Sequence, residues 1–197
     1  MDKYSAEENL KLIREVMERS ARYTNFSGLS GVLSGVLALI GCAVTYWIND
    51  HVAVSRQDML YILTWCTVLV LAIAQDLLLA HRNARKSGQS IWNPATYQVF
   101  KAIFPGVFFA GVISFVALYD GAIDAIPAIW ALGYGAALCA AGLFTTREVW
   151  RYGLLQMATG TAGLFLMSKP PYSLYLVALC FGLYQIAFGI CMTRKQR

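Results

Sequence analysis

The chain has 197 residues and a net charge of +5, and 58% of its residues are hydrophobic whereas 14% are charged. Soluble domains carry about 45–50% apolar and about 25% charged residues, so this composition excludes an ordinary soluble domain. The apolar residues form runs close to the roughly 20 residues that a helix needs to cross a bilayer. The sequence therefore predicts an all-α integral membrane protein.

Residues 1–24 predict an amphipathic helix at the membrane surface. Ser5 and Glu8 form a capping-box pattern, which starts a helix near residue 5. Leu10, Ile13 and Met17 recur at helical spacing, and charged residues occupy many of the other positions. The segment lacks the apolar core of a signal peptide, so we expect no cleavage there.

Six apolar segments follow, and they predict a six-helix transmembrane bundle over residues 25–192 with a basic tail at 193–197. Asn93 and Pro94 mark a helix start, because they suit the N-cap and the first helical turn. Pro105 predicts a kink in the third span. The expected spans are about 28–48, 59–80, 97–119, 126–145, 150–168 and 174–192.

The first span carries small residues on one face, with Ser27, Gly31 and Gly35 spaced four apart. Lipid gives helices no hydrophobic reason to associate, so close contact over small residues supplies the packing. This face can lie in the middle of the bundle, in a homodimer, or against a partner subunit. The sequence leaves all three interpretations open.

Basic residues are distributed unevenly between the two sides of the predicted bundle. Of the 16 lysines and arginines, all but Arg56 and Lys169 fall on the side of the N-terminal helix and the tail. Short loops rich in lysine and arginine stay in the cytoplasm, so both termini are predicted to be cytoplasmic. Aromatic residues such as Tyr152 mark the inner interface. Topology thus explains the positive charge, and we expect no nucleic-acid partner.

Asp76, which follows Gln75 near the inner end of the second span, is the principal ionisable candidate within the membrane. Ionisable groups at such positions are costly and point to function. The carboxylate can reach cytoplasmic water or pair with a basic residue such as Lys101 or Arg147. As a hypothesis, Asp76 and Lys101 form a charged pair.

Several other polar residues fall at a similar depth in their own spans. Because a polar group in hydrocarbon must find a partner or water, these residues predict a hydrated pocket that opens to the cytoplasm. The expected pocket residues are Asp76, Lys101, Gln75, Gln156, Gln185 and Glu148.

Patterns for metal or cofactor chemistry are weak. His51 and His81 fall on opposite sides of the membrane, and the five cysteines form no CxxC pair. The cysteines are interpreted as packing residues. The sequence contains no phosphate-binding glycine loop and no nucleophile elbow. We therefore expect no metal, no cofactor and no enzymatic activity.

The run MERSARY at 17–23, followed by SGLSG at 27–31, resembles a signature of small bacterial polytopic inner-membrane proteins with no assigned activity. The resemblance covers about a fifth of the chain. It implies a multi-pass protein of a bacterial inner membrane and carries over no functional residue. In size and number of spans the chain is also similar to the substrate-binding membrane subunits of vitamin importers.

Two functions remain as expectations. The first is a small-solute transporter or channel subunit with a polar pocket facing the cytoplasm. The alternative is a regulatory or scaffold protein of the membrane that docks a cytoplasmic partner through its N-terminal helix. The expected partners are the lipid bilayer and either a second copy of the chain or a cytoplasmic protein.

Overall fold

The computed structural model describes residues 28–86, 94–166 and 172–195, and these residues are helical apart from short turns. The predicted amphipathic helix at 1–24 lies outside the described residues, as do Ser27 and the last two residues of the tail. The helices are α2 (Gly28–His51), α3 (Val54–Lys86), α4 (Pro94–Tyr119), the 3₁₀ turn η1 (Ile123–Ala125), α5 (Ile126–Gly142), α6 (Arg147–Leu166), and α7 (Tyr172–Val177), which continues through the π-helical η2 (Ala178–Leu183) into α8 (Tyr184–Lys195).

Most of these helices can span a bilayer. Within the described residues, five segments are long and apolar enough: Gly28–His51, Val54–Asn83, Thr96–Tyr119, Ile123–Gly142 and Tyr172–Lys195. α6 is not among them, because Arg151, Gln156 and other polar residues lower its hydropathy. Its 20 residues still give about 30 Å of helix, the thickness of the hydrocarbon core. The structure therefore supports an all-helical membrane protein.

The first two helices approach each other more closely than the sequence predicts. The first predicted span ends at 48 and the second begins at 59, but α2 continues to His51 and α3 begins at Val54. Side chains replace the loop, because Gln57 Nε2 donates to the carbonyl oxygens of Asn49 (3.3 Å) and Val52 (2.9 Å). Such bonds satisfy carbonyls that a helix end leaves unpaired.

The turn between α5 and α6 also differs from its predicted position. α5 ends at Gly142 rather than at 145, and α6 begins at Arg147 rather than at 150. Thr145 Oγ1 donates to the carbonyl of Ala141 at 2.9 Å, which closes the end of α5. The turn is tight because Gly142 packs directly against the backbone of Trp150.

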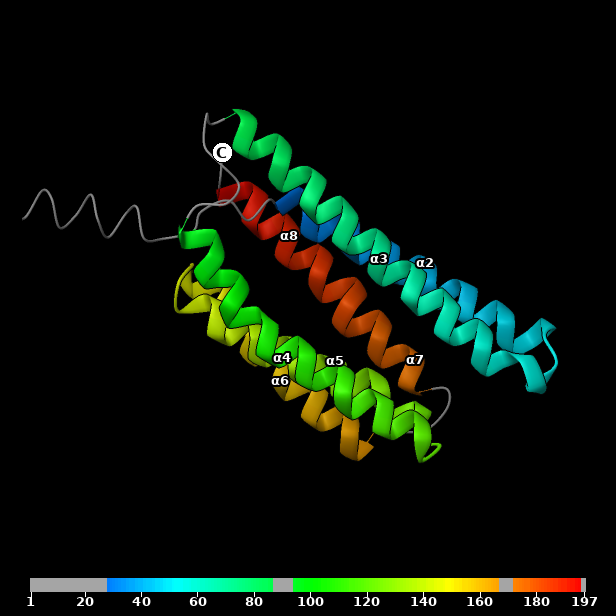
Figure 1. The fold of residues 1–197 in the computed structure, drawn as a ribbon. Helices are drawn as coiled ribbons and strands as arrows, with labels where there is room; N and C mark the ends of the chain where they lie inside the picture. Colours follow the sequence, from blue (N-terminus) through cyan, green and yellow to red (C-terminus); the bar gives the residue numbers. More distant parts are fainter. Residues whose placement is uncertain (1–27, 87–93, 167–171, 196–197) are drawn as a thin grey trace, which may run out of the picture.

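The helices form two layers (Figure 1). The first layer contains α3, α2 and the α7–α8 segment, with α2 between the other two. The second layer contains α4, α5 and α6, with α5 in the middle. The α7–α8 segment is the part of the first layer that contacts α5 and α6, so the boundary between the layers runs along it.

The two ends of the bundle differ in charge. One end, called the basic end, holds the starts of α2, α4 and α6 and the ends of α3 and α8 (Figure 1). At or toward it lie Arg82, Arg85, Lys101, Arg147, Arg151, Arg194 and Lys195. Arg56 lies at the opposite end with Asp50, Asp58, Asp120 and Asp124.

Glycines set the distance between helices inside each layer. A Cβ atom on Gly189 of α8 would lie 2.6 Å from the carbonyl oxygen of Gly28 in α2. Gly31 and Gly35 face the same seam, so the small-residue face of the first span lies inside the bundle against η2 and α8. In the second layer, Gly153 of α6 meets the backbone of α5 equally closely. Backbones at this separation leave no room for a side chain.

Candidate functional site

A chain of hydrogen bonds crosses the boundary between the two layers. Its four side chains, called the central cluster, are Tyr134 of α5, Tyr152 and Gln156 of α6, and Gln185 of α8. Gln156 Nε2 donates to Tyr152 Oη at 2.7 Å, and Tyr152 Oη donates to Gln185 Oε1 at 2.5 Å. Gln185 Nε2 then donates to Tyr134 Oη at 3.3 Å. The cluster is polar but carries no formal charge.

Gln156 is the most deeply placed member of the central cluster. Its side chain is 0% exposed, and its Oε1 atom has no hydrogen-bond partner in the described structure. A buried acceptor without a partner costs about 1–3 kcal/mol, so such atoms are rare and call for an explanation. A hydrogen-bond donor from a passing or bound molecule would satisfy this atom.

The π-helical turn η2 lies directly beside Gln156. The second bond of Gln156 Nε2 goes to the carbonyl oxygen of Cys180, at 2.8 Å, inside this turn. A π turn interrupts the regular α-helical ladder, and such turns occur frequently at functional sites. The Gln156 side chain of α6 bonds to a carbonyl of this turn, so the irregular turn belongs to the same site.

Apolar side chains close the central cluster on both sides. The inner hydrophobic cluster lies between it and the basic end, and the outer hydrophobic cluster lies toward the acidic end. Tyr152 belongs to the inner cluster and stacks on Phe188, with ring centroids 4.5 Å apart. The inner cluster is Leu138, Val149 and Tyr152, with Tyr134, Tyr184 and Phe188 packed against it. The outer cluster is Ala128, Ala131, Leu176 and Cys180 with Phe181.

A second polar group joins α2 to α3. Ser30 Oγ donates to Asp76 Oδ1 at 2.6 Å, and Gln75 Nε2 lies 2.6 Å from both Asp76 Oδ1 and Ser34 Oγ. The Asp76 side chain also remains exposed on the surface of the bundle. Neutral donors, Ser30 of α2 and Gln75 of the same helix, therefore hold this carboxylate.

The predicted pair of Asp76 with Lys101 is not formed in the structure. Lys101 Nζ lies over the ring of Tyr97 in its own helix, 4.4 Å from the centroid. Among the described residues no ion pair joins it to Asp76, whose carboxylate accepts from Ser30 instead. A lysine can hold its ammonium over an aromatic ring one turn away without crossing to another helix.

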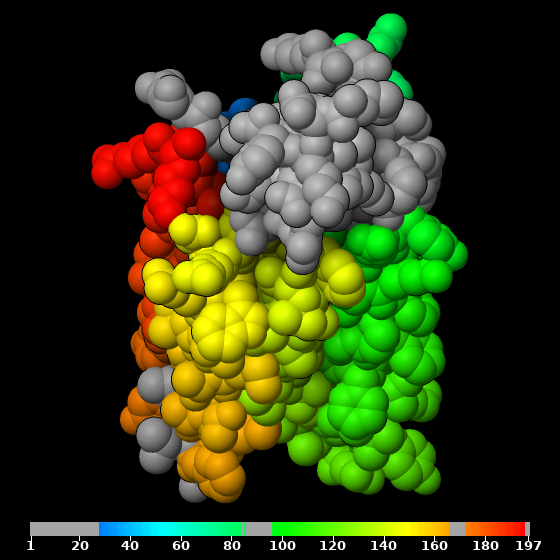
Figure 2. Space-filling model, turned by 90° about the vertical axis from the view of Figure 1, so that its left-hand side faces the viewer, coloured from blue at the N-terminus to red at the C-terminus, as the bar shows by residue number. Residues whose placement is uncertain are grey.

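The six predicted pocket residues therefore fall into separate groups. Gln156 and Gln185 meet in the central cluster, Gln75 and Asp76 meet between α2 and α3, and Lys101 lies on α4. Glu148 forms an ion pair with Lys195 at the basic end, where the start of α6 and the end of α8 lie side by side (Figure 2).

The Glu148–Lys195 pair predicts a small pH effect on stability. The hydrogen bond from Lys195 lowers the pKa of Glu148 from 4.5 to about 2. Because folding lowers this pKa, the pair stabilises the protein at pH values above 4.5. This stabilisation is lost as the pH falls from 4.5 toward 2. The difference in thermal midpoint between wild type and Glu148→Gln should be small, because the pair is exposed, and should shrink across that window. A difference that stays constant with pH would contradict the assignment.

Sequence reasoning found half of the central cluster and missed the other half. Tyr152 was interpreted as an interfacial anchor, and Tyr134 was not predicted to belong to the pocket. The spacing of Tyr152 and Gln156, four residues apart, places both on one helix face and is a signal for the pair. The carbonyl of Cys180 gives no such signal, because the sequence shows neither the π turn nor the approach of Gln156 to it.

The fold and these contacts define the class of the molecule as a helical membrane protein with a buried polar site. Comparisons with protein-family models, curated proteins and solved structures find no match to this chain. Within the described residues, no group of three or more histidine, cysteine, aspartate or glutamate side chains is placed to hold a metal ion.

Proposed function

We propose that this protein is a small-solute transporter or channel subunit, and that its solute passes between the two layers at the central cluster. The observation that carries the proposal is Gln156, which is fully buried and keeps an acceptor oxygen without a partner. A transport role is proposed in preference to an enzymatic one, because the cluster offers hydrogen bonds and no nucleophile with an activating base.

The chemistry of the central cluster favours an uncharged polar solute. Its tyrosine hydroxyls and glutamine amides both donate and accept hydrogen bonds. No member carries a formal charge that would balance an ion, and bringing an ion to this depth without a counter-charge would be costly. Gln156 follows Arg147 by nine residues, which places it about 14 Å from the basic end and inside the hydrocarbon core.

The layered packing supports a rocking mechanism. Within the layers, glycines bring backbones into direct contact between α2 and α8, between α4 and α5, and between α5 and α6, whereas α6 meets α7 through side chains such as Leu176 against Gly163. Two stiff layers with a softer boundary can tilt against each other, as the halves of alternating-access transporters do. Tilting one way opens the inner hydrophobic cluster, and tilting the other way opens the outer one.

The distribution of charge supports a bacterial inner membrane with both termini in the cytoplasm. The described lysines and arginines other than Arg56 gather at the basic end, and the acidic residues of the short turns lie at the other. This is the arrangement that the positive-inside rule describes. The inner hydrophobic cluster then faces the cytoplasm. The alternative scaffold function depends on residues 1–24, which lie outside the described residues.

Thiol labelling tests whether water reaches the central cluster. One variant keeps Cys180 and replaces Cys42, Cys66, Cys139 and Cys191 with alanine; the control keeps Cys66 in place of Cys180. Cys180 is buried beside Gln156, whereas Cys66 lies on the outside of α3. In sealed vesicles a charged, membrane-impermeant thiol reagent should modify Cys180 faster than Cys66, because thiolates form only where water is present. Equal, negligible rates from both sides of the membrane would overturn the proposal.

A further inference from the structure

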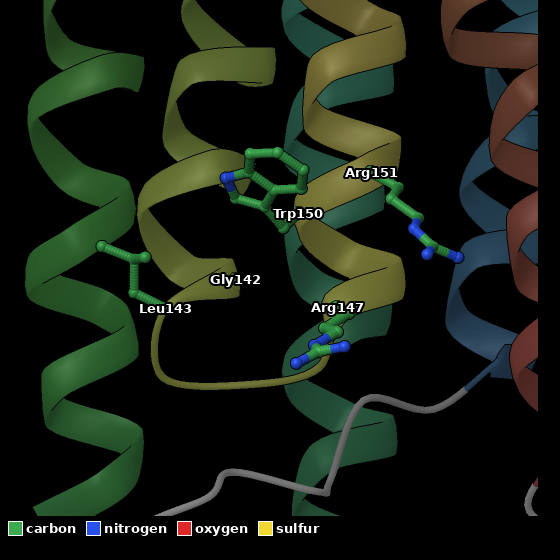
Figure 3. A pocket seen from close by; sticks show the side chains of 5 residues that line it. All are labelled: Gly142, Leu143, Arg147, Trp150 and Arg151. Carbon is green, nitrogen blue, oxygen red and sulfur yellow. The ribbon is translucent and has the colours of Figure 1, made fainter.

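A shallow hollow lies at the basic end, where the α5–α6 turn meets the first turns of α6. Its volume is about 390 Å³, and it is open on one side. Figure 3 shows Arg147 beneath the indole ring of Trp150, close to the turn, with Arg151 extending from the next turn of α6 and directed away from the ring. The lining residues are Gly142, Leu143, Arg147, Trp150 and Arg151.

The hollow combines positive charge with an apolar wall. Arg147 and Arg151 make no ion pair with any described residue, and the carboxylate of Glu148, which follows Arg147 in the sequence, is paired with Lys195. Leu143 is 77% exposed and Trp150 is 42% exposed. A guanidinium beside an exposed indole and leucine suits a molecule with an anionic head and an apolar body.

The position of the hollow along the bundle fits the same kind of molecule. It lies where α5 ends and α6 begins, which is the level at which the apolar spans give way to the polar end. Tryptophan prefers this interfacial level. Basic pockets between transmembrane helices on the cytoplasmic side bind the headgroups of anionic lipids.

We propose that this hollow binds the phosphate headgroup of an anionic phospholipid, with Arg147 contacting the phosphate, Arg151 adding positive charge one turn further along α6, and Trp150 and Leu143 contacting the start of an acyl chain. The site is separate from the central cluster, so lipid binding stands whether or not the protein transports a solute. The lipid would hold the turn between α5 and α6 at a fixed depth in the membrane.

Lipid binding can be measured on the full chain by native mass spectrometry after delipidation in detergent. Phosphatidylglycerol is titrated against wild type, the double variant Arg147→Gln/Arg151→Gln, and the matched control Arg82→Gln/Arg85→Gln at the end of α3. Each basic residue near an anionic surface strengthens binding about fivefold, so the double variant should bind about 25-fold more weakly. The control, which loses the same charge elsewhere, should bind like wild type.

Two further arms identify the ligand and protect against a folding defect. Phosphatidylcholine and inorganic phosphate should each bind far more weakly than phosphatidylglycerol; equal binding of either would overturn a site for anionic lipid. Arg147→Lys/Arg151→Lys should keep much of the affinity, because it keeps both charges while losing the planar guanidinium. The proposal is also overturned if the Arg147→Gln/Arg151→Gln protein, eluting from gel filtration like wild type, binds phosphatidylglycerol normally.

Discussion

Gln156→Leu is expected to lose both stability and water access at the central cluster. Leucine fills a similar volume but leaves the carbonyl of Cys180 without its donor and removes one bond to Tyr152. Leaving buried polar atoms unpaired costs about 1–3 kcal/mol, which should lower the thermal midpoint in detergent. In the variant that keeps only Cys180, the labelling rate should fall to that of Cys66.

Thr159→Val provides the matched control for Gln156→Leu. Thr159 lies one turn further along α6, and its hydroxyl donates only to the carbonyl of Leu155 in the same helix, at 2.9 Å. Removing such a local bond changes little, because that carbonyl belongs to the helical ladder. If Gln156→Leu has the same thermal midpoint and the same Cys180 labelling rate as Thr159→Val, the central cluster has neither of the roles assigned to it.

Gly153→Ala is expected to disrupt the packing of α5 on α6. A Cβ at this position would lie 2.7 Å from both the amide nitrogen of Cys139 and the carbonyl oxygen of Gly135. These atoms belong to the backbone of α5, so they cannot turn aside as a flexible side chain does. Overpacking of this kind costs about 1–3 kcal/mol, and reversible unfolding in detergent measures it directly.

Gly111→Ala is the matched control for Gly153→Ala. Gly111 also lies within a long helix, α4, but a Cβ atom there would meet nothing within 4 Å. Alanine favours the helix over glycine by about 0.5–1 kcal/mol, so this variant should be neutral or slightly more stable. Equal destabilisation by both substitutions would show that glycine is needed for some reason other than helix contact.

The sequence predicted the spans well where apolar runs were long and bounded by charge. α4, for example, begins at Pro94 and ends at Tyr119, close to the predicted 97–119. The turn between α2 and α3 was predicted less well, because its polar residues resemble a loop. Gln57 of α3 instead bonds to the Asn49 carbonyl at the end of α2, and a hydrogen bond of that kind depends on the approach of the second helix.

The candidate site was predicted only in part, because the sequence does not give the orientation of each helix about its own axis. Gln156 and Gln185 were expected to share a pocket, and they do lie in one hydrogen-bonded cluster. Asp76 and Lys101 were expected to pair because both lie toward the same end of their spans. The depth of a residue in the membrane follows from its position along the helix, but the direction of its side chain depends on which helix faces pack together. In the structure Asp76 contacts Ser30 and Lys101 contacts Tyr97 instead.

The sequence by itself determined that the chain is a helical membrane protein and that positive charge gathers at one end, because hydrophobic length and loop charge are local properties. It also indicated that polar side chains would lie within the membrane. Only the tertiary structure decided which of these side chains meet, since glycine contacts fix the spacing and rotation of each helix pair. The bond from Gln156 to the Cys180 carbonyl, inside the π turn, likewise depends on how α6 packs against η2.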